Sequence, residues 1–116
     1  MTVNVMPLKP SVIHLVDIIE YPKTGVRRKI LLEDGNCQYA LMLLASETDI
    51  AEHTSPRNAT VNVIEGQGVL TLEDKEIALE VGVFAFIPAN ERHAVRAVTN
   101  LAFLLTLSEQ DTNCNI

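Results

Sequence analysis

The sequence lacks tryptophan, has only two tyrosines and three phenylalanines, and has nine lysines and arginines against fifteen aspartates and glutamates. The formal net charge is −6 with neutral histidines. Nine scattered cations cannot form the basic patch that binding to nucleic acid requires. The few aromatic residues are spaced as core or interface residues, not as a platform on which bases stack. We therefore expect no nucleic-acid partner.

Long apolar runs are also missing. The longest are Leu41–Ala45, Val83–Ile87 and Leu101–Leu105. Each is far shorter than the ~18 residues that a membrane-spanning helix requires. The first cation is Lys9, so the sequence does not start with the basic residues of a secretory signal peptide. Two cysteines, Cys37 and Cys114, are too few for a disulfide framework. We expect a cytoplasmic protein with no membrane partner.

The chain does contain enough apolar residues for one packed core. It has 116 residues, of which 47% are hydrophobic and 21% are charged. This length suits one domain and is too short for two. We therefore expect residues 1–116 to form a single domain, in which the polar terminal residues 108–116 are a loose tail.

Short apolar segments alternate with turn residues from residue 26 onward. The expected strands are Val26–Leu32, Cys37–Leu44, Ala59–Ile64, Val69–Leu72, Glu76–Leu79, Val83–Ile87, His93–Val98 and Leu101–Leu107. Asp34-Gly35, between the first two, is a strong hairpin signal. Valine, isoleucine, threonine and phenylalanine, which favour strands, are frequent in these segments. Many short strands with regular turns are typical of an all-β sandwich or barrel.

The segment Val12–Tyr21 fits two structures. Its apolar residues recur at helical spacing, at Val12, Leu15, Val16 and Ile19. Ser11 could cap such a helix. The same segment could instead be a lone strand on the wall of a barrel, and the pattern does not distinguish the two.

Two groups of residues have a spacing that carries further meaning. The first group is Glu47, His53, Ser55, Ala59 and Gly66. The second group is Gly82, Pro88, Asn90, His93 and Ala97. Their spacing resembles the two sequence motifs of the cupin family, and the segments around His53 and His93 look like those of small single-domain cupins of bacteria. The resemblance covers residues 47–97, and it implies a double-stranded β-helix, the cupin jelly-roll barrel.

The two groups match the cupin pattern at some positions and depart from it at others. The matching residues are His53, Gly66, Gly82, Pro88 and His93. Ser55 stands where the pattern has a second histidine, and Ala59 stands where it has a glutamate. Glu47 and Asn90 replace glycines, and Ala97 replaces an asparagine. The change at Asn90 is mild, because asparagine tolerates a positive φ better than most residues.

The departures fall on metal-ligand positions. In metal-binding cupins, two histidines and a glutamate of the first motif and one histidine of the second converge inside the barrel. Imidazoles with a carboxylate suit zinc, nickel, manganese or iron. The resemblance leaves only His53 and His93 as candidate metal ligands here. Glu52 is the nearest carboxylate, but in an extended chain it faces away from the side that His53 and Ser55 share.

Two interpretations of the histidine pair follow. His53 and His93 could hold a divalent metal whose remaining ligands are water, substrate or another side chain. Alternatively, the two imidazoles hydrogen-bond each other, Ser55 or water in a pocket without metal. The second is favoured, because most metal sites with open positions still have three protein ligands.

The motif geometry predicts that His53 and His93 lie close together inside the barrel. Each follows a turn that brings the chain to the same end of the barrel. Because Ser55 and Ala59 are small, we expect a cavity where larger ligands would otherwise lie. Its expected walls are Val61, Val63, Phe84 and Phe86. A mostly apolar cavity with two convergent imidazoles has the usual form of a small-molecule site.

Val26–Lys29 is the only basic cluster. Arginine is mostly exposed in proteins, so a solvated strand face is the favoured interpretation. The alternative is that Arg28 points inward, where its fork of donors would hold the carboxylate of an anionic ligand.

These observations favour a cupin-fold protein that binds a small molecule in a degenerate pocket, which could also hold a metal. The alternative is a metal-dependent isomerase, lyase or dioxygenase acting on a small organic substrate. The missing histidine and carboxylate leave no obvious general base except His53 or His93, which favours binding over catalysis. A third possibility is a structural or regulatory protein without a ligand.

We also expect a homodimer. Small single-domain cupins commonly pair, which is what the resemblance implies. In addition, the amphipathic edges Val12–Ile19 and Leu101–Leu107 hold more apolar surface than the interior of one small barrel needs. Most soluble oligomers are closed two-fold dimers.

Overall fold

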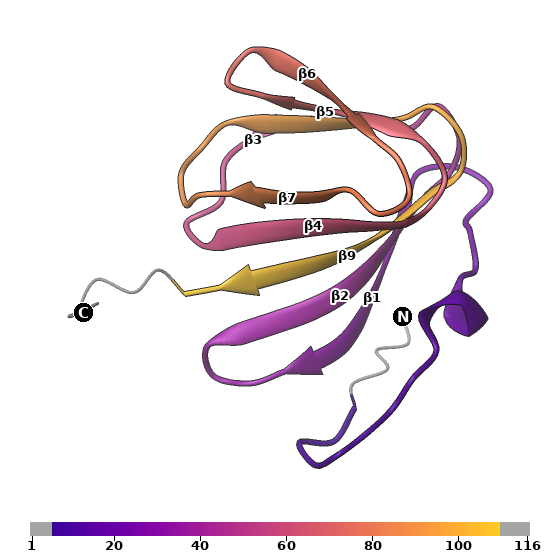
Figure 1. Ribbon diagram of the computed structural model, residues 1–116, viewed down its shortest axis with the longest axis vertical. Helices are drawn as coiled ribbons and strands as arrows, with labels where there is room; N and C mark the ends of the chain where they lie inside the picture. Colours follow the sequence, from indigo (N-terminus) through magenta and orange to yellow (C-terminus); the bar gives the residue numbers. More distant parts are fainter. Residues whose placement is uncertain (1–5, 110–116) are drawn as a thin grey trace.

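The computed structural model describes residues 6–109, which form two antiparallel sheets facing each other (Figure 1). The strands are β1 (Val26–Glu33), β2 (Cys37–Leu44), β3 (Asp49–His53), β4 (Asn58–Glu65), β5 (Gly68–Leu72), β6 (Lys75–Leu79), β7 (Phe84–Ile87), β8 (His93–Ala97) and β9 (Leu101–Ser108). One sheet has the order β1-β2-β9-β4-β7 and the other the order β3-β8-β5-β6. The all-β jelly-roll architecture expected from the sequence is confirmed.

The core lies between the two sheets and follows from the alternation along the strands. In β4, the buried residues Ala59, Val61 and Val63 alternate with partly exposed neighbours. Strand β2 is different, because Ala40–Leu44 is buried throughout. A strand buried on both faces needs a cover on its outer side, and the N-terminal segment provides it.

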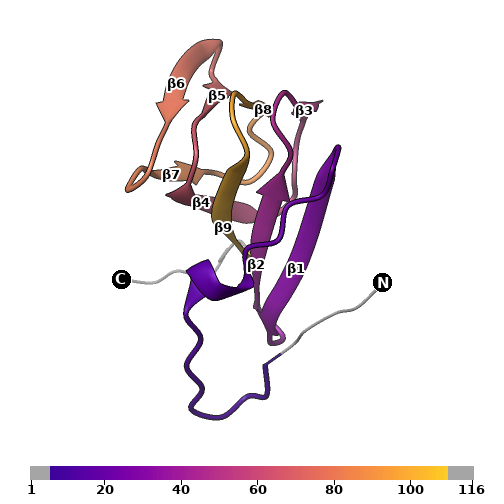
Figure 2. The same cartoon turned by 90° about the vertical axis from the view of Figure 1, so that its right-hand side faces the viewer.

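The N-terminal segment packs on the outer face of the five-stranded sheet. Leu15, Ile18 and Tyr21 contact a cluster that includes Leu41 and Leu43 of β2. Figure 2 shows a loop that extends away from both sheets, followed by η1 (Leu15–Ile18) and by a stretch that crosses in front of β2 to the start of β1. The segment contains one 3-10 turn, η1, so it is neither the regular helix nor the lone strand that the sequence allowed.

The boundaries of several elements differ from the sequence-based expectation. The Ser11 hydroxyl does not cap η1 but donates to the Lys9 carbonyl at 2.9 Å. Strand β3 was not expected, because its residues are mostly polar and exposed. Residues 108–116 were expected to form a loose tail, and this expectation is wrong for the first two of them. Ser108 ends β9, and the Glu109 N–H donates to the Asn36 carbonyl. The rest of that tail, residues 110–116, lies outside the described residues.

None of the helices in residues 6–109 has the length and apolar character needed to cross a membrane.

Candidate functional site

Two hydrogen bonds donated by backbone N–H groups join the loops of the two sequence motifs. The Asn90 N–H donates to the Ser55 carbonyl at 2.7 Å, and the Ala89 N–H donates to the Asn58 side-chain oxygen at 2.9 Å. Asn90 has a φ of +68°, a conformation that asparagine adopts more readily than most residues. The turn before β8 is thereby fixed against the segment that follows β3.

His53 and His93 face each other across an antiparallel strand pair. His53 ends β3, His93 begins β8, and the two are direct partners in the register. Their ring centroids are 4.3 Å apart, with the planes tilted by 59°. The structure thus brings together two residues that are forty positions apart in the sequence. His93 is buried, whereas His53 lies at the exposed side of the pair.

An irregularity in β3 turns His53 inward. The register shifts between Ile50, which pairs with Val95, and His53, which pairs with His93. Residues three apart on a regular strand face opposite sides, but both Ile50 and His53 line the same cavity. A bulge of this kind commonly redirects a side chain next to a functional site. Glu52, between them, does not line the cavity and is exposed.

Both imidazoles have their Nδ1 atoms fixed by the backbone. His53 Nδ1 is 2.9 Å from the Ala51 carbonyl oxygen, and His93 Nδ1 is 2.9 Å from the Glu91 carbonyl oxygen. A carbonyl oxygen only accepts hydrogen bonds, so each Nδ1 is the donor and carries the proton. This tautomer leaves the Nε2 lone pair for a ligand.

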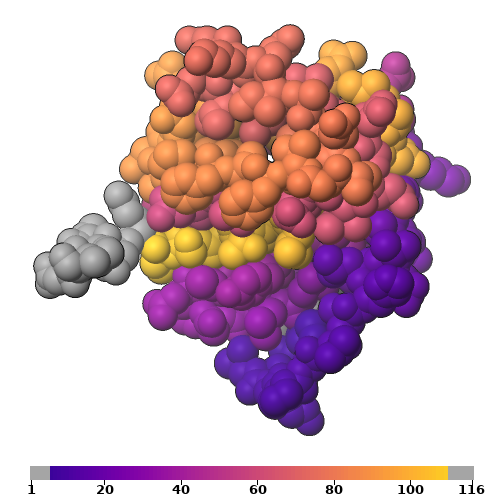
Figure 3. Space-filling model, viewed as in Figure 1, coloured from indigo at the N-terminus to yellow at the C-terminus, as the bar shows by residue number. Residues whose placement is uncertain are grey.

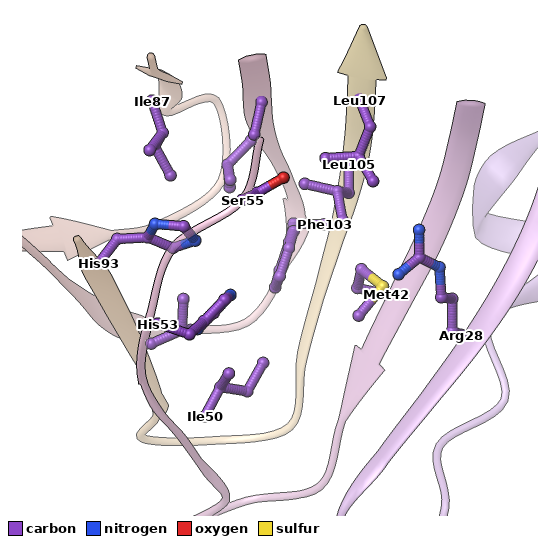
Figure 4. Close-up of a pocket in the computed structure, with 13 residues that line it drawn as sticks. Arg28, Met42, Ile50, His53, Ser55, Ile87, His93, Phe103, Leu105 and Leu107 are labelled. Atoms are coloured by element: carbon purple, nitrogen blue, oxygen red, sulfur yellow. The ribbon is translucent and has the colours of Figure 1, made fainter. Parts of the chain in front are cut away.

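The histidine pair opens into a cavity of about 360 Å³ between the two sheets. Its lining residues are Arg28, Met42, Ile50, His53, Ser55, Ala59, Val61, Ile87, His93, Val95, Phe103, Leu105 and Leu107. Most of this lining is apolar, and Figure 4 shows several of the labelled side chains pointing toward a common space. Ser55, Ala59 and Val61 were expected in the lining and lie there. A volume of this size is in the range of small-molecule sites.

Two expected wall residues are on the wrong face. Phe84 and Phe86 are 64% and 53% exposed. They pair with Asn62 and Thr60 of β4, whose side chains point outward, so the inward residue at this end of β7 is Ile87. The space-filling view shows the region of β7, in orange, at the surface of the molecule (Figure 3).

Val63 was also expected in the wall of the cavity, and this prediction is wrong. It does point inward, as Ala59 and Val61 do, but it is only 2% exposed and packs in the core, beyond the end of the cavity.

The sequence pattern did not lead us to expect the large contribution of β9 to the cavity wall. Phe103, Leu105 and Leu107 line the cavity at every second position, and this period-2 spacing was the signal that could have identified them.

Arg28 lies on the inner face of β1, against the favoured interpretation of a solvated strand face. It pairs in register with Met42, and both side chains line the cavity, although Arg28 as a whole remains exposed. Its guanidinium donates to the Gln38 side-chain oxygen, and the Gln38 amide donates to Glu33. Burial lowers the pKa of Arg28, the cation of Arg57 lowers it further, and Glu33 acts in the opposite direction.

The donor set fits a metal in kind but not in number. An imidazole that donates its second ring N–H to a backbone carbonyl is the usual arrangement of a histidine ligand. Within residues 6–109, however, no group of three or more histidine, cysteine, aspartate or glutamate side chains converges as a metal site would require. Ala59 is a buried wall residue with no ligand atom on its side chain. A resident metal would thus have two protein ligands, where open sites commonly have three.

The chain is similar to a known family in sequence and to several solved structures in fold. The model of the cupin domain family matches residues 40–107. No curated protein matches the sequence. A conserved protein of unknown function from Streptococcus pyogenes is 20% identical, with a TM-score of 0.80, over 97% of this chain and 98% of that chain.

Two further solved structures have similar folds. A cupin superfamily protein from Desulfitobacterium hafniense is 20% identical, with a TM-score of 0.80, and the match covers 92% of this chain and 96% of that chain. A predicted oxalate decarboxylase from Thermotoga maritima is 20% identical, with a TM-score of 0.69, over 73% of this chain and 81% of that chain. At such identities the likeness concerns the fold alone.

Proposed function

We propose a function for this chain, which belongs to the cupin family. The cavity beside His53 and His93 binds a small organic molecule, and this binding is the function of the protein. The observation that carries the proposal is the orientation of the two imidazoles. Both have Nδ1 engaged with the backbone, so both Nε2 atoms are acceptors at one end of an apolar cavity. A ligand with a hydroxyl or amine group would satisfy them.

A metal-dependent enzyme is the second candidate, and the fixed tautomers of His53 and His93 are the observation that favours it. The two Nε2 atoms could hold a zinc, nickel, manganese or iron ion whose other ligands come from water and the bound molecule. The family resemblance points to isomerase, lyase or dioxygenase chemistry. Two protein ligands are fewer than such sites usually have, so we place binding first.

Metal analysis and native mass spectrometry of the protein purified without a histidine tag test the proposal. We expect a bound small molecule in the wild type and in His14→Ala, whose imidazole is exposed far along the chain from the motifs. We expect its loss in the double variant His53→Ala/His93→Ala, with an unchanged far-ultraviolet spectrum. A stoichiometric metal in the wild type that disappears with the pair would favour the enzyme. Equal retention of a ligand by all three proteins would reject the site.

We further propose that the protein is a cytoplasmic homodimer. One part of the sequence argument was wrong, because Leu101, Ala102 and Phe103 are buried within the subunit. Support comes instead from the outer face of the five-stranded sheet, where Phe84 and Phe86 are exposed. η1 packs against the same sheet and leaves Val16 51% exposed. Exposed apolar residues on one face of a small domain are typical of an interaction surface.

A further inference from the structure

The cavity has a single charged group in its described lining, and that group is a cation. Besides Arg28, the lining consists of apolar side chains, Ser55 and the two histidines, with no aspartate or glutamate among them. Figure 4 shows the Arg28 guanidinium on the side opposite the two imidazoles, with Met42 and Phe103 between. A guanidinium beside apolar walls favours an anionic partner, because its charge is less screened there than in water.

The guanidinium is held in position by its neighbours. Gln38, which is largely buried, accepts one of its N–H donors through Oε1, and the Gln38 amide group donates in turn to Glu33. A guanidinium has five N–H donors in a fixed fork. The contact with Gln38 orients the fork and leaves donors for a ligand. Glu33 accepts from Gln38, its charge raises the pKa of Arg28, and it lies outside the cavity lining.

A second cation, Arg57, acts on the Arg28 guanidinium. The charge of Arg57 lowers the pKa of the Arg28 guanidinium, and the charge of Glu33 raises it. The Arg57 backbone N–H donates to the Ser55 hydroxyl at 3.2 Å, which ties this residue to the cavity wall. The charge of Arg57 disfavours the charged form of Arg28, as a like charge does. A bound anion would relieve that repulsion.

We propose that the ligand is a small monocarboxylic acid with a hydrocarbon body and a hydroxyl group at its far end. The Arg28 fork would bind the carboxylate, since its geometry matches two carboxylate oxygens. The hydrocarbon would lie against Met42, Phe103 and Leu105. The hydroxyl would donate to an Nε2 atom of the histidine pair. This inference rests on the proposed function and adds the chemical class of the ligand.

The test compares acids with their neutral amides. Isothermal titration calorimetry measures binding of 4-hydroxybutanoate, 6-hydroxyhexanoate and 8-hydroxyoctanoate, and of the corresponding amides. We expect at least one acid to bind more tightly than its amide. Replacing Arg28 by glutamine should weaken that acid roughly 10- to 100-fold, the range expected for a lost charged hydrogen bond, and should leave the amide unchanged. Arg28→Lys should recover only part of the loss, because lysine lacks the fork.

Arg27→Gln is the matched control. Arg27 is the neighbouring residue on β1, and its side chain pairs with Glu20 at 3.2 Å rather than lining the cavity. We expect this variant to bind the acid as the wild type does. The proposal is overturned if Arg27→Gln and Arg28→Gln weaken the acid equally, or if no acid binds better than its amide up to roughly 10 mM. Amide binding that is lost in His93→Gln, without any preference for the acid, would overturn the carboxylate site and leave the proposed function intact.

Discussion

Asn90 shows how a single backbone conformation holds the site together. Its φ of +68° allows its N–H to reach the Ser55 carbonyl, which joins the loops that carry His53 and His93. Glu47, at the position where the cupin pattern has a glycine, also has a positive φ, of +66°. The pattern's glycines at these two positions therefore reflect a backbone requirement, which this chain meets with other residues at some cost in strain.

Substitution at Asn90 should separate backbone conformation from side-chain chemistry. We expect Asn90→Gly to unfold at nearly the same urea concentration as the wild type, since glycine adopts a positive φ without strain. A β-branched residue does not, so Asn90→Val should lower the free energy of unfolding by about 1–3 kcal/mol. Urea unfolding followed by circular dichroism measures both. Equal stability of the two variants would show that the conformation of this turn is not the constraint.

At the scale of elements, the sequence predicted which strands exist better than which way they face. Strand β4 was placed correctly because its apolar residues alternate with polar ones. The run Val83–Ile87 is apolar at every position, so it carried no information on which face is buried, and Phe84 and Phe86 were assigned to the wrong side. That information lies in the pairing with β4, a long-range contact. Strand β3 was missed because a polar, exposed strand lacks the apolar signal.

The candidate site, like the strands, was predicted in its position better than in the directions of its side chains. The spacing of the two motifs was sufficient to pair His53 with His93. The inward direction of Arg28 was not predictable, because β1 is an edge strand whose alternating residues include charges on both faces. Nor could a sequence pattern reveal the register shift in β3 that turns both Ile50 and His53 toward the cavity.

The hairpin between β1 and β2 should depend on pH through Asp34. Its carboxylate accepts the backbone N–H groups of Asn36 at 2.8 Å and Cys37 at 2.7 Å, and these bonds lower the pKa of Asp34. A lowered folded-state pKa stabilises the fold above the ordinary aspartate value of about 3.9, and this contribution is lost as the pH falls through the lower folded value. Asp34→Asn should therefore be less stable than the wild type at neutral pH.

Thermal unfolding at a series of pH values measures this difference. We expect the wild type and Asp34→Asn to converge once the pH falls below the lowered folded-state pKa of Asp34, where the carboxyl group is protonated and resembles the amide. A stability difference that stays constant from neutral to acidic pH would contradict the role of the charge.

At the scale of the whole molecule, the outer face of the five-stranded sheet is covered unevenly. The N-terminal segment covers Leu41 and Leu43, while Phe84 and Phe86 on the edge strand β7 remain exposed. An apolar edge left open in this way invites association with another chain. A two-fold dimer through this face would cover the two phenylalanines of each copy.

Light scattering after size exclusion tests the dimer. We expect a mass near twice the 12.8 kDa of one chain, and the mass of one chain for Phe84→Ser/Phe86→Ser. Val81→Ser, which removes another exposed apolar side chain near β7, is the control and should stay dimeric. A wild type that elutes with the mass of one chain at micromolar concentration would reject the dimer, and a dimer that persists in the double variant would place the interface elsewhere.

The most direct test of the central claim, that the histidine cavity is a ligand site, is nuclear magnetic resonance of protein labelled at the histidine Cε1 carbons. The sequence has three histidines, and His14, with a side chain 75% exposed, serves as the internal reference. On titration with 6-hydroxyhexanoate, we predict that the signals of His53 and His93 shift together and saturate while that of His14 stays unchanged. Signals of His53 and His93 that do not move, or that move no more than that of His14, would contradict the account.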